Sequence, residues 1–146
     1  MKHALIALAT FSAGLFALPA QAQPNATLDA AAREPGAVVT STGLVFRSLK
    51  EGSGARPGAS DSVKVHYRGT FPDGKEFDSS YARGTPIEFP LNRVIPCWTE
   101  GVQRIQVGGK AKLTCPSRIA YGERGAGNVI PPNATLVFEV ELLGVR

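Results

Sequence analysis

The strict alternation of apolar and polar residues over 62–71 constrains the fold of this chain more than any other feature. Val63, Val65 and Tyr67 fall on one side of an extended backbone, and the residues between them are polar. Alternation with a period of two is typical of a strand in an antiparallel sheet with one buried face. The segment 135–143 alternates in the same way, so both segments are predicted to be strands with one apolar side.

One segment has helical periodicity instead. Trp98, Val102 and Ile105 stand at i, i+4 and i+7, Pro96 suits a first helical turn, and Gly108-Gly109 ends the helix. Shorter strand patterns occur at 43–50, 75–78, 87–91 and 110–115. These elements predict an α+β fold, with a curved antiparallel sheet of about five strands wrapped around one short helix.

The N-terminal segment has the pattern of a secretory signal peptide. A short basic start is followed by apolar residues 4–18 and by the small-residue cleavage pattern Ala20-Gln21-Ala22. We therefore expect residues 1–22 to be a signal peptide, 23–42 to be a flexible lead-in, and 43–146 to form one domain.

Charge and hydropathy exclude two classes of partner. The chain carries 16 Lys and Arg against 12 Asp and Glu, a net charge of +4, without a basic cluster, which argues against nucleic-acid binding. The apolar run of the signal is short for a bilayer and no second run follows, so no membrane span is expected. We also expect a monomer, because the lead-in is too short to build a dimerisation domain.

Cys97 and Cys115 are the only cysteines. An even number in an exported chain favours a disulfide, with two buried free thiols as the alternative. A disulfide that closes this loop would stabilise the fold by about 3 kcal/mol. Two cysteines and two histidines, one of them His3 in the signal segment, cannot supply a four-ligand zinc site. We therefore expect no metal and no cofactor.

The residues allow two interpretations of the chemistry. Cys97, His66 and Asp78 are candidates for a Cys/His nucleophile, although His66 falls on the polar side of its strand and Cys97 has a partner for oxidation. Aromatic residues, by contrast, gather on the predicted inward faces, at the helix start and in the long loop 116–132. Around the single carboxylate of Asp78 they would form an apolar pocket with one polar group, and an ordinary aromatic core is the alternative.

Several motifs occur in order between residues 43 and 145. They are Val63-Lys64-Val65-His66-Tyr67-Arg68-Gly69, Asp73-Gly74-Lys75-Glu76-Phe77-Asp78-Ser79-Ser80, Arg83-Gly84-Thr85-Pro86, Val94-Ile95-Pro96-Cys97-Trp98, Ala120-Tyr121-Gly122 and Ile130-Pro131-Pro132 with the strand that follows. Together they resemble the FK506-binding-protein (FKBP) type of peptidyl-prolyl cis–trans isomerase, in its exported bacterial form. Cys97 stands where this family usually has glycine.

The resemblance implies the roles of individual residues. Trp98 would lie under the proline ring, the Ile95 N–H and the Tyr121 hydroxyl would donate to substrate carbonyls, and Asp78 would accept from Tyr67. The implied catalytic residues are Tyr67, Phe77, Asp78, Trp98, Tyr121 and Phe138. The implied substrate-binding residues are Ile87, Phe89, Val94, Ile95 and Ile130.

The resemblance also implies an activity and its partners. An apolar pocket would favour the twisted amide of an Xaa-Pro bond without a nucleophile or a metal, because the twisted amide loses resonance and charge separation. The expected partners are proline-containing polypeptides, together with macrolides of the FK506 type, and the expected location is the periplasm or beyond it. A chaperone-like or partner-binding module with little turnover is the alternative function.

Overall fold

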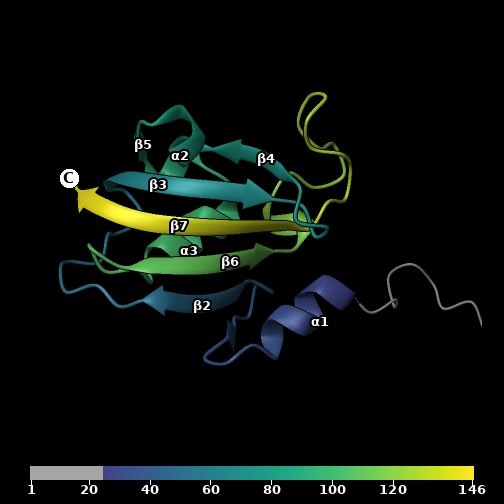
Figure 1. Cartoon of the computed structure of the whole chain (residues 1–146), viewed down its shortest axis with the longest axis horizontal. Helices are drawn as coiled ribbons and strands as arrows, with labels where there is room; N and C mark the ends of the chain where they lie inside the picture. The colour runs from purple at the N-terminus through teal and green to yellow at the C-terminus, as the bar shows by residue number, and fades with distance from the viewer. Residues whose placement is uncertain (1–24) are drawn as a thin grey trace, which may run out of the picture.

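A seven-stranded sheet with one helix behind it forms the body of the molecule (Figure 1). The structure is a computed structural model that describes residues 25–146, so the predicted signal peptide lies outside the described residues. The strands are β1 (Val38–Val39), β2 (Val45–Lys50), β3 (Ser62–Thr70), β4 (Glu76–Ser79), β5 (Ile87–Pro90), β6 (Lys110–Cys115) and β7 (Leu136–Val145). The helices are α1 (Ala26–Ala32), α2 (Ser80–Arg83) and α3 (Pro96–Val102), with 3-10 turns η2 (Leu91–Arg93) and η3 (Ser117–Ile119).

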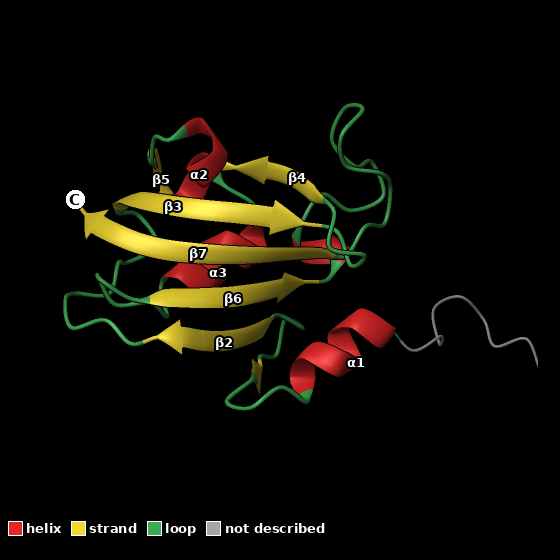
Figure 2. Cartoon of the chain, viewed as in Figure 1, coloured by secondary structure: helices red, strands yellow, loops and turns green. Residues whose placement is uncertain are grey.

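The order of the strands in space differs from their order along the chain. The sheet runs β1-β2-β6-β7-β3-β4, and β5 also pairs with β3. All these pairs are antiparallel. Figure 2 shows β7, the last strand of the chain, in the middle of the sheet between β6 and β3.

The two longest strands confirm the predicted alternation. In β3 the side chains of Val63, Val65 and Tyr67 are buried, and in β7 those of Phe138 and Val140 are buried. The register sets Tyr67 opposite Val140, so both apolar rows lie on the same face. We call this the inner face, because α3 packs against it, and the opposite face of the sheet the outer face. The predicted α+β fold, a sheet wrapped around one helix, is confirmed, but the sheet has seven strands rather than about five, because it includes the two-residue β1 and the short β4 and β5.

Helix α3 begins where the sequence predicts and ends earlier. Pro96 is in its first turn, and the helix ends at Val102 rather than near Gly108. The N–H groups of Arg104 and Ile105 bond to carbonyls three residues back, at 3.0 and 3.1 Å. That spacing belongs to a tighter 3-10 turn. Ile105 is still buried, so its apolar position was predicted correctly although its backbone is not α-helical.

A disulfide joins α3 to the sheet. Cys97 in the first turn of α3 is bonded to Cys115 at the end of β6, with their Cα atoms 5.9 Å apart. Both residues are fully buried. The structure therefore confirms the predicted pairing and excludes the alternative of two free thiols.

The segment 25–42 differs from the expected flexible lead-in. It forms α1 and β1, and β1 extends the edge of the sheet by pairing with β2. The Asn25 side chain caps α1 by accepting from Leu28 N at 3.1 Å and donates to Thr135 Oγ1 at 2.8 Å. An Asn cap satisfies a helix N–H that has no partner within the helix. This segment is therefore part of the domain.

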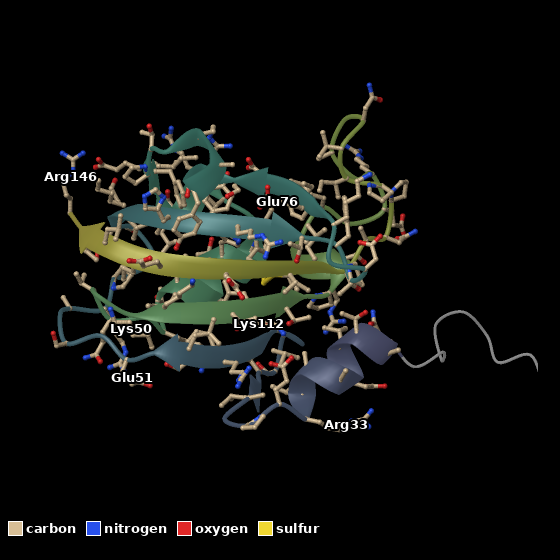
Figure 3. All side chains as sticks on the ribbon, in the orientation of Figure 1. Arg33, Lys50, Glu51, Glu76, Lys112 and Arg146 are labelled. Carbon is tan, nitrogen blue, oxygen red and sulfur yellow. A yellow bond between two sulfur atoms is a disulfide. The ribbon has the colours of Figure 1, made fainter. Side chains whose placement is uncertain are left out.

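Ion pairs hold α1 on the outer face of the sheet. Glu34, just after α1, accepts from Lys112 Nζ of β6 at 2.6 Å and from Arg47 Nη1 of β2 at 2.9 Å. The hydrogen bond from Lys112 lowers the pKa of Glu34, and the hydrogen bond from Arg47 adds to this effect. Figure 3 shows Lys112 beside the helix. Sequence periodicity carries no sign of these contacts, because the three residues belong to three separate segments.

Two connections position the residues of the site. The segment 79–85, expected to be a loop or a bulge, contains the short helix α2, which is capped by Ser79 and ends at Gly84 with φ 72°. The long connection after β6 begins with η3 and projects beyond the end of the sheet (Figure 1). Among residues 25–146, no helix has both the length and the hydrophobicity that crossing a bilayer requires.

Candidate functional site

A pocket of about 520 Å³ opens on the inner face of the sheet beside α3. Its volume falls within the range of small-molecule sites, about 300–1,000 Å³. Strands β3, β4, β5 and β7, the segment from η2 into α3, and the long connection all contribute to it. The lining residues are Tyr67, Phe77, Asp78, Ile87, Phe89, Arg93, Val94, Ile95, Trp98, Tyr121 and Phe138.

Trp98 forms an aromatic floor with three neighbouring rings. Its ring meets Tyr67 and Phe138 edge to face, with centroids 5.0 and 5.3 Å apart, and Phe89 lies at 5.4 Å. Edge-to-face pairs at this distance stabilise an aromatic cluster beyond the burial of area alone. Trp98 is only 5% exposed, so the surrounding rings fix its position.

Gly69 in β3 makes room for the ring of Phe77. A Cβ atom at this position would lie 2.5 Å from the Phe77 ring and 3.0 Å from Phe138. Phe77 fills the space instead and meets Phe138 edge to face at 5.7 Å. The glycine in the alternating pattern of β3 is therefore a packing requirement of the pocket wall.

The polar edge of the pocket consists of Tyr67, Asp78 and Arg83. The Tyr67 hydroxyl donates to Asp78 Oδ2, and Arg83 donates to Asp78 Oδ1 and, at 3.2 Å, to the Tyr67 oxygen. The N–H of Ser79 donates to Asp78 Oδ1 at 2.9 Å. This carboxylate therefore accepts hydrogen bonds at both oxygens, which fixes its orientation.

The same contacts set the protonation of the pair. Burial on its own raises the pKa of Asp78, but the hydrogen bonds from Tyr67 and Arg83 outweigh it and hold the pKa below its ordinary value. Burial raises the pKa of Tyr67, and its hydrogen bond to Asp78 raises it further. At neutral pH Asp78 is therefore ionised and Tyr67 keeps its proton.

Ser80 ties the backbone of Tyr67 to α2. Its buried Oγ accepts from Tyr67 N at 2.7 Å and lies 3.2 Å from Tyr67 O and 2.8 Å from His66 Nδ1. His66 itself points to the outer face, where its ring stacks on Tyr81 at 4.6 Å. Ser80 thus fixes β3 at the residue whose hydroxyl borders the pocket.

The interpretation of Cys97, His66 and Asp78 as a Cys/His nucleophile is wrong. Cys97 is in a disulfide and carries no thiol, and His66 faces away from the pocket that Asp78 lines. Among the described residues, no group of three or more His, Cys, Asp and Glu side chains is arranged to hold a metal ion.

Two residues differ from the predicted set. Ile130 does not line the pocket but is buried in the core, where its backbone pairs with Ala126 in the long connection. Arg93 lines the pocket from η2 and was missed, because an exposed arginine in an irregular segment gives no periodic signal. The other ten predicted pocket residues come together. Tyr121 lies at the mouth and is 41% exposed.

Comparison with known proteins identifies the class to which this fold and pocket belong. A family model described as FKBP-type peptidyl-prolyl cis-trans isomerase matches residues 54–143. The chain belongs to this family.

Individual relatives carry the same family description. The chain is 56% identical over 119 residues to the FKBP-type isomerase FkpA of Aeromonas hydrophila and 54% identical over 115 residues to FkpA of Escherichia coli strain K12. These alignments cover 82% and 79% of this chain but 44% and 42% of the relatives. The chain thus spans less than half the length of these curated relatives.

Solved structures share the fold. The crystal structure of FkpA from Escherichia coli superposes with a TM-score of 0.79 at 52% identity, covering 82% of this chain and 55% of that one. A peptidyl-prolyl cis-trans isomerase from Pseudomonas syringae pv. tomato superposes with a TM-score of 0.76 at 39% identity, covering 82% of this chain and 87% of that one.

Proposed function

We propose that this protein is a peptidyl-prolyl cis–trans isomerase that accelerates the isomerisation of Xaa-Pro bonds in polypeptides. The observation that carries the proposal is the aromatic pocket over Trp98, closed at one edge by the Tyr67–Asp78–Arg83 cluster. Membership of the FKBP family supports the same activity.

The pocket suits a reaction that needs no proton transfer. The barrier to amide rotation, about 18–20 kcal/mol, comes from the partial double bond between carbon and nitrogen. The twisted amide has lost this resonance and its charge separation, so an apolar surrounding favours it over the planar ground state. The rings of Trp98, Phe77 and Phe138 would supply that surrounding, with the proline ring seated on Trp98.

Two free donors suit the flanking carbonyls of a substrate. Within residues 25–146 neither the Ile95 N–H nor the Tyr121 hydroxyl donates a hydrogen bond, and both residues line the pocket. Free donors in an apolar pocket hold a ligand in one orientation. We assign them to the carbonyl oxygens on either side of the proline, while Asp78 orients Tyr67.

The proposal extends to the setting of the enzyme. We infer that residues 1–22 are a signal peptide, that the chain acts in the periplasm or beyond it, and that it is a monomer. Proline-containing exported proteins would be its substrates, and macrolides of the FK506 type would compete for the pocket.

A protease-coupled proline assay on the exported chain tests the activity. Trp98→Leu keeps an apolar floor with less area, and we expect it to reduce kcat/KM by at least about tenfold in a folded protein. The matched control is Tyr81→Leu, because Tyr81 is an aromatic residue of the outer face. If the wild-type chain bound proline peptides without accelerating them, the alternative of a binding module would replace the isomerase.

A further inference from the structure

Arg93 is a cation at the pocket for which the described contacts provide no counterion. It lines the pocket from η2, its side chain is exposed, and among residues 25–146 it makes no ion pair. Asp78, the other charged residue that lines the pocket, is paired with Arg83. Arg93 is therefore the charge of the pocket lining that has no ion-pair partner among residues 25–146.

A second groove adjoins the pocket at Val94, which lines both. Asn92 and Val94, the two neighbours of Arg93 in the chain, line this groove, and Val94 lines the pocket as well. A peptide that extends from the pocket toward this groove would follow the segment 92–94, whose middle residue is Arg93. The groove also contains Glu100 and Arg104, whose formal charges offset each other.

We propose that Arg93 makes the enzyme prefer polypeptides with an acidic side chain close to the proline. This inference rests on the proposed function and adds a substrate class to it. A guanidinium binds a carboxylate through paired hydrogen bonds in a fixed geometry. The proline itself occupies the aromatic floor, so the carboxylate belongs to a neighbouring residue that lies along η2.

The expected size of the preference for acidic peptides is small, because the Arg93 side chain is exposed. An exposed ion pair changes an equilibrium by about 1.4- to 5-fold. We expect a substrate with glutamate beside the Leu-Pro unit to react about two- to five-fold faster than its glutamine analogue at low salt, and the lysine analogue to be slower still. Raising the salt to about 0.5 M shortens the screening length and should shrink these differences.

The test uses six peptides with one Leu-Pro core and a single glutamate, glutamine or lysine placed before or after it. Exchange spectroscopy gives the isomerisation rate of each peptide with the full-length protein. The readout is the ratio of the glutamate rate to the lysine rate, which does not depend on any overall loss of activity. Arg93→Gln should bring this ratio close to one, and Arg93→Glu should invert it.

Arg56→Glu is the matched control. Arg56 is exposed, does not line the pocket and makes no ion pair within the described residues, yet this variant changes the net charge by the same amount. The inference is overturned if the ratio in the wild-type chain is one on both sides of the core, or if Arg56→Glu shifts it as far as Arg93→Glu does.

A binding measurement separates this inference from the proposed function. The chain has one tryptophan, and it lies in the pocket, so peptide binding is followed by its fluorescence. Acceleration of all peptides without a charge preference overturns the inference and leaves the isomerase intact. If no peptide is accelerated, the isomerase fails, and the ratio of dissociation constants for the glutamate and lysine peptides still decides the role of Arg93.

Discussion

Different forces stabilise the packing on the inner face and on the outer face of the sheet. The inner face packs apolar side chains against α3 and carries the disulfide and the aromatic pocket. The outer face carries charged residues such as Lys110, Lys112 and Glu139, and Glu34, just after α1, pairs with Lys112 there. One strand serves both faces, because β3 contributes Tyr67 to the pocket and His66 to the outer face.

This difference shows where sequence changes have consequences. Apolar burial contributes about 1.5–3 kcal/mol per large side chain, whereas an exposed ion pair contributes about 0–1 kcal/mol. Changes to the inner-face residues that line the pocket should therefore alter stability and activity together. Changes on the outer face should alter stability slightly and activity hardly at all.

The largest expected effect is the loss of the pocket floor. Trp98→Ala should lower the free energy of unfolding by about 3–5 kcal/mol, since it opens a cavity in the core. Tyr81→Ala on the outer face should cost clearly less. Urea unfolding of both variants measures the difference, and equal losses would contradict the contrast between the faces.

The disulfide comes next. The Cys97→Ser/Cys115→Ser variant should be less stable by about 3 kcal/mol, because the unfolded chain regains the entropy of an 18-residue loop. The same variant should keep most of its activity at moderate temperature. The denatured wild-type protein should show no titratable thiol before reduction, and two free thiols per chain would refute the pairing.

Ser80 contacts both His66 of the outer face and the backbone of Tyr67, whose side chain lines the pocket. A change at Ser80 therefore tests whether contacts on the outer face affect the pocket. Ser80→Ala removes the acceptor of the buried Tyr67 N–H and should cost about 1–3 kcal/mol in unfolding free energy. The rate should fall as well, since β3 shifts at Tyr67. Ser60→Ala, at an exposed position, is the control. If the Ser80→Ala protein were destabilised but fully active, the packing around Ser80 would not be coupled to the pocket.

Glu34 measures how much an ion pair of the outer face contributes to stability. Its pKa is lower in the folded state than its ordinary 4.5, so its ionised form stabilises the fold above pH 4.5, and this contribution disappears as pH falls through the folded-state pKa. Glu34→Gln should cost about 1 kcal/mol at pH 7 and less at pH 3. Exposed Glu51→Gln is the control, and hydrogen exchange in α1 measures the effect locally.

The smallest effect is expected for His66. A reaction by desolvation needs no proton transfer, so the rate should be nearly flat from about pH 6 to 8, and His66→Ala should keep most of the rate. A bell-shaped profile centred near neutrality, or an inactive but folded His66→Ala protein, would contradict the proposed mechanism.

The sequence was most informative where burial and periodicity coincide. The alternation of β3 and β7 predicted the inner face, and the resemblance to the FKBP family implied ten of the eleven residues that line the pocket. Docking of α1 was missed because it depends on Glu34, Lys112 and Arg47 meeting across separate segments. The place of Ile130 depends on backbone pairing inside an irregular loop, which no pattern of side chains reveals.

The position of β7 determines when the domain can form. This strand, ten residues long, pairs with β6 on one side and with β3 on the other. The two halves of the sheet therefore cannot join before residues 136–145 are available. Pairing across such long separations in sequence slows folding and leaves apolar strands exposed in the meantime. On any route that delivers the chain N-terminus first, this domain stays unfolded until almost its last residue has emerged.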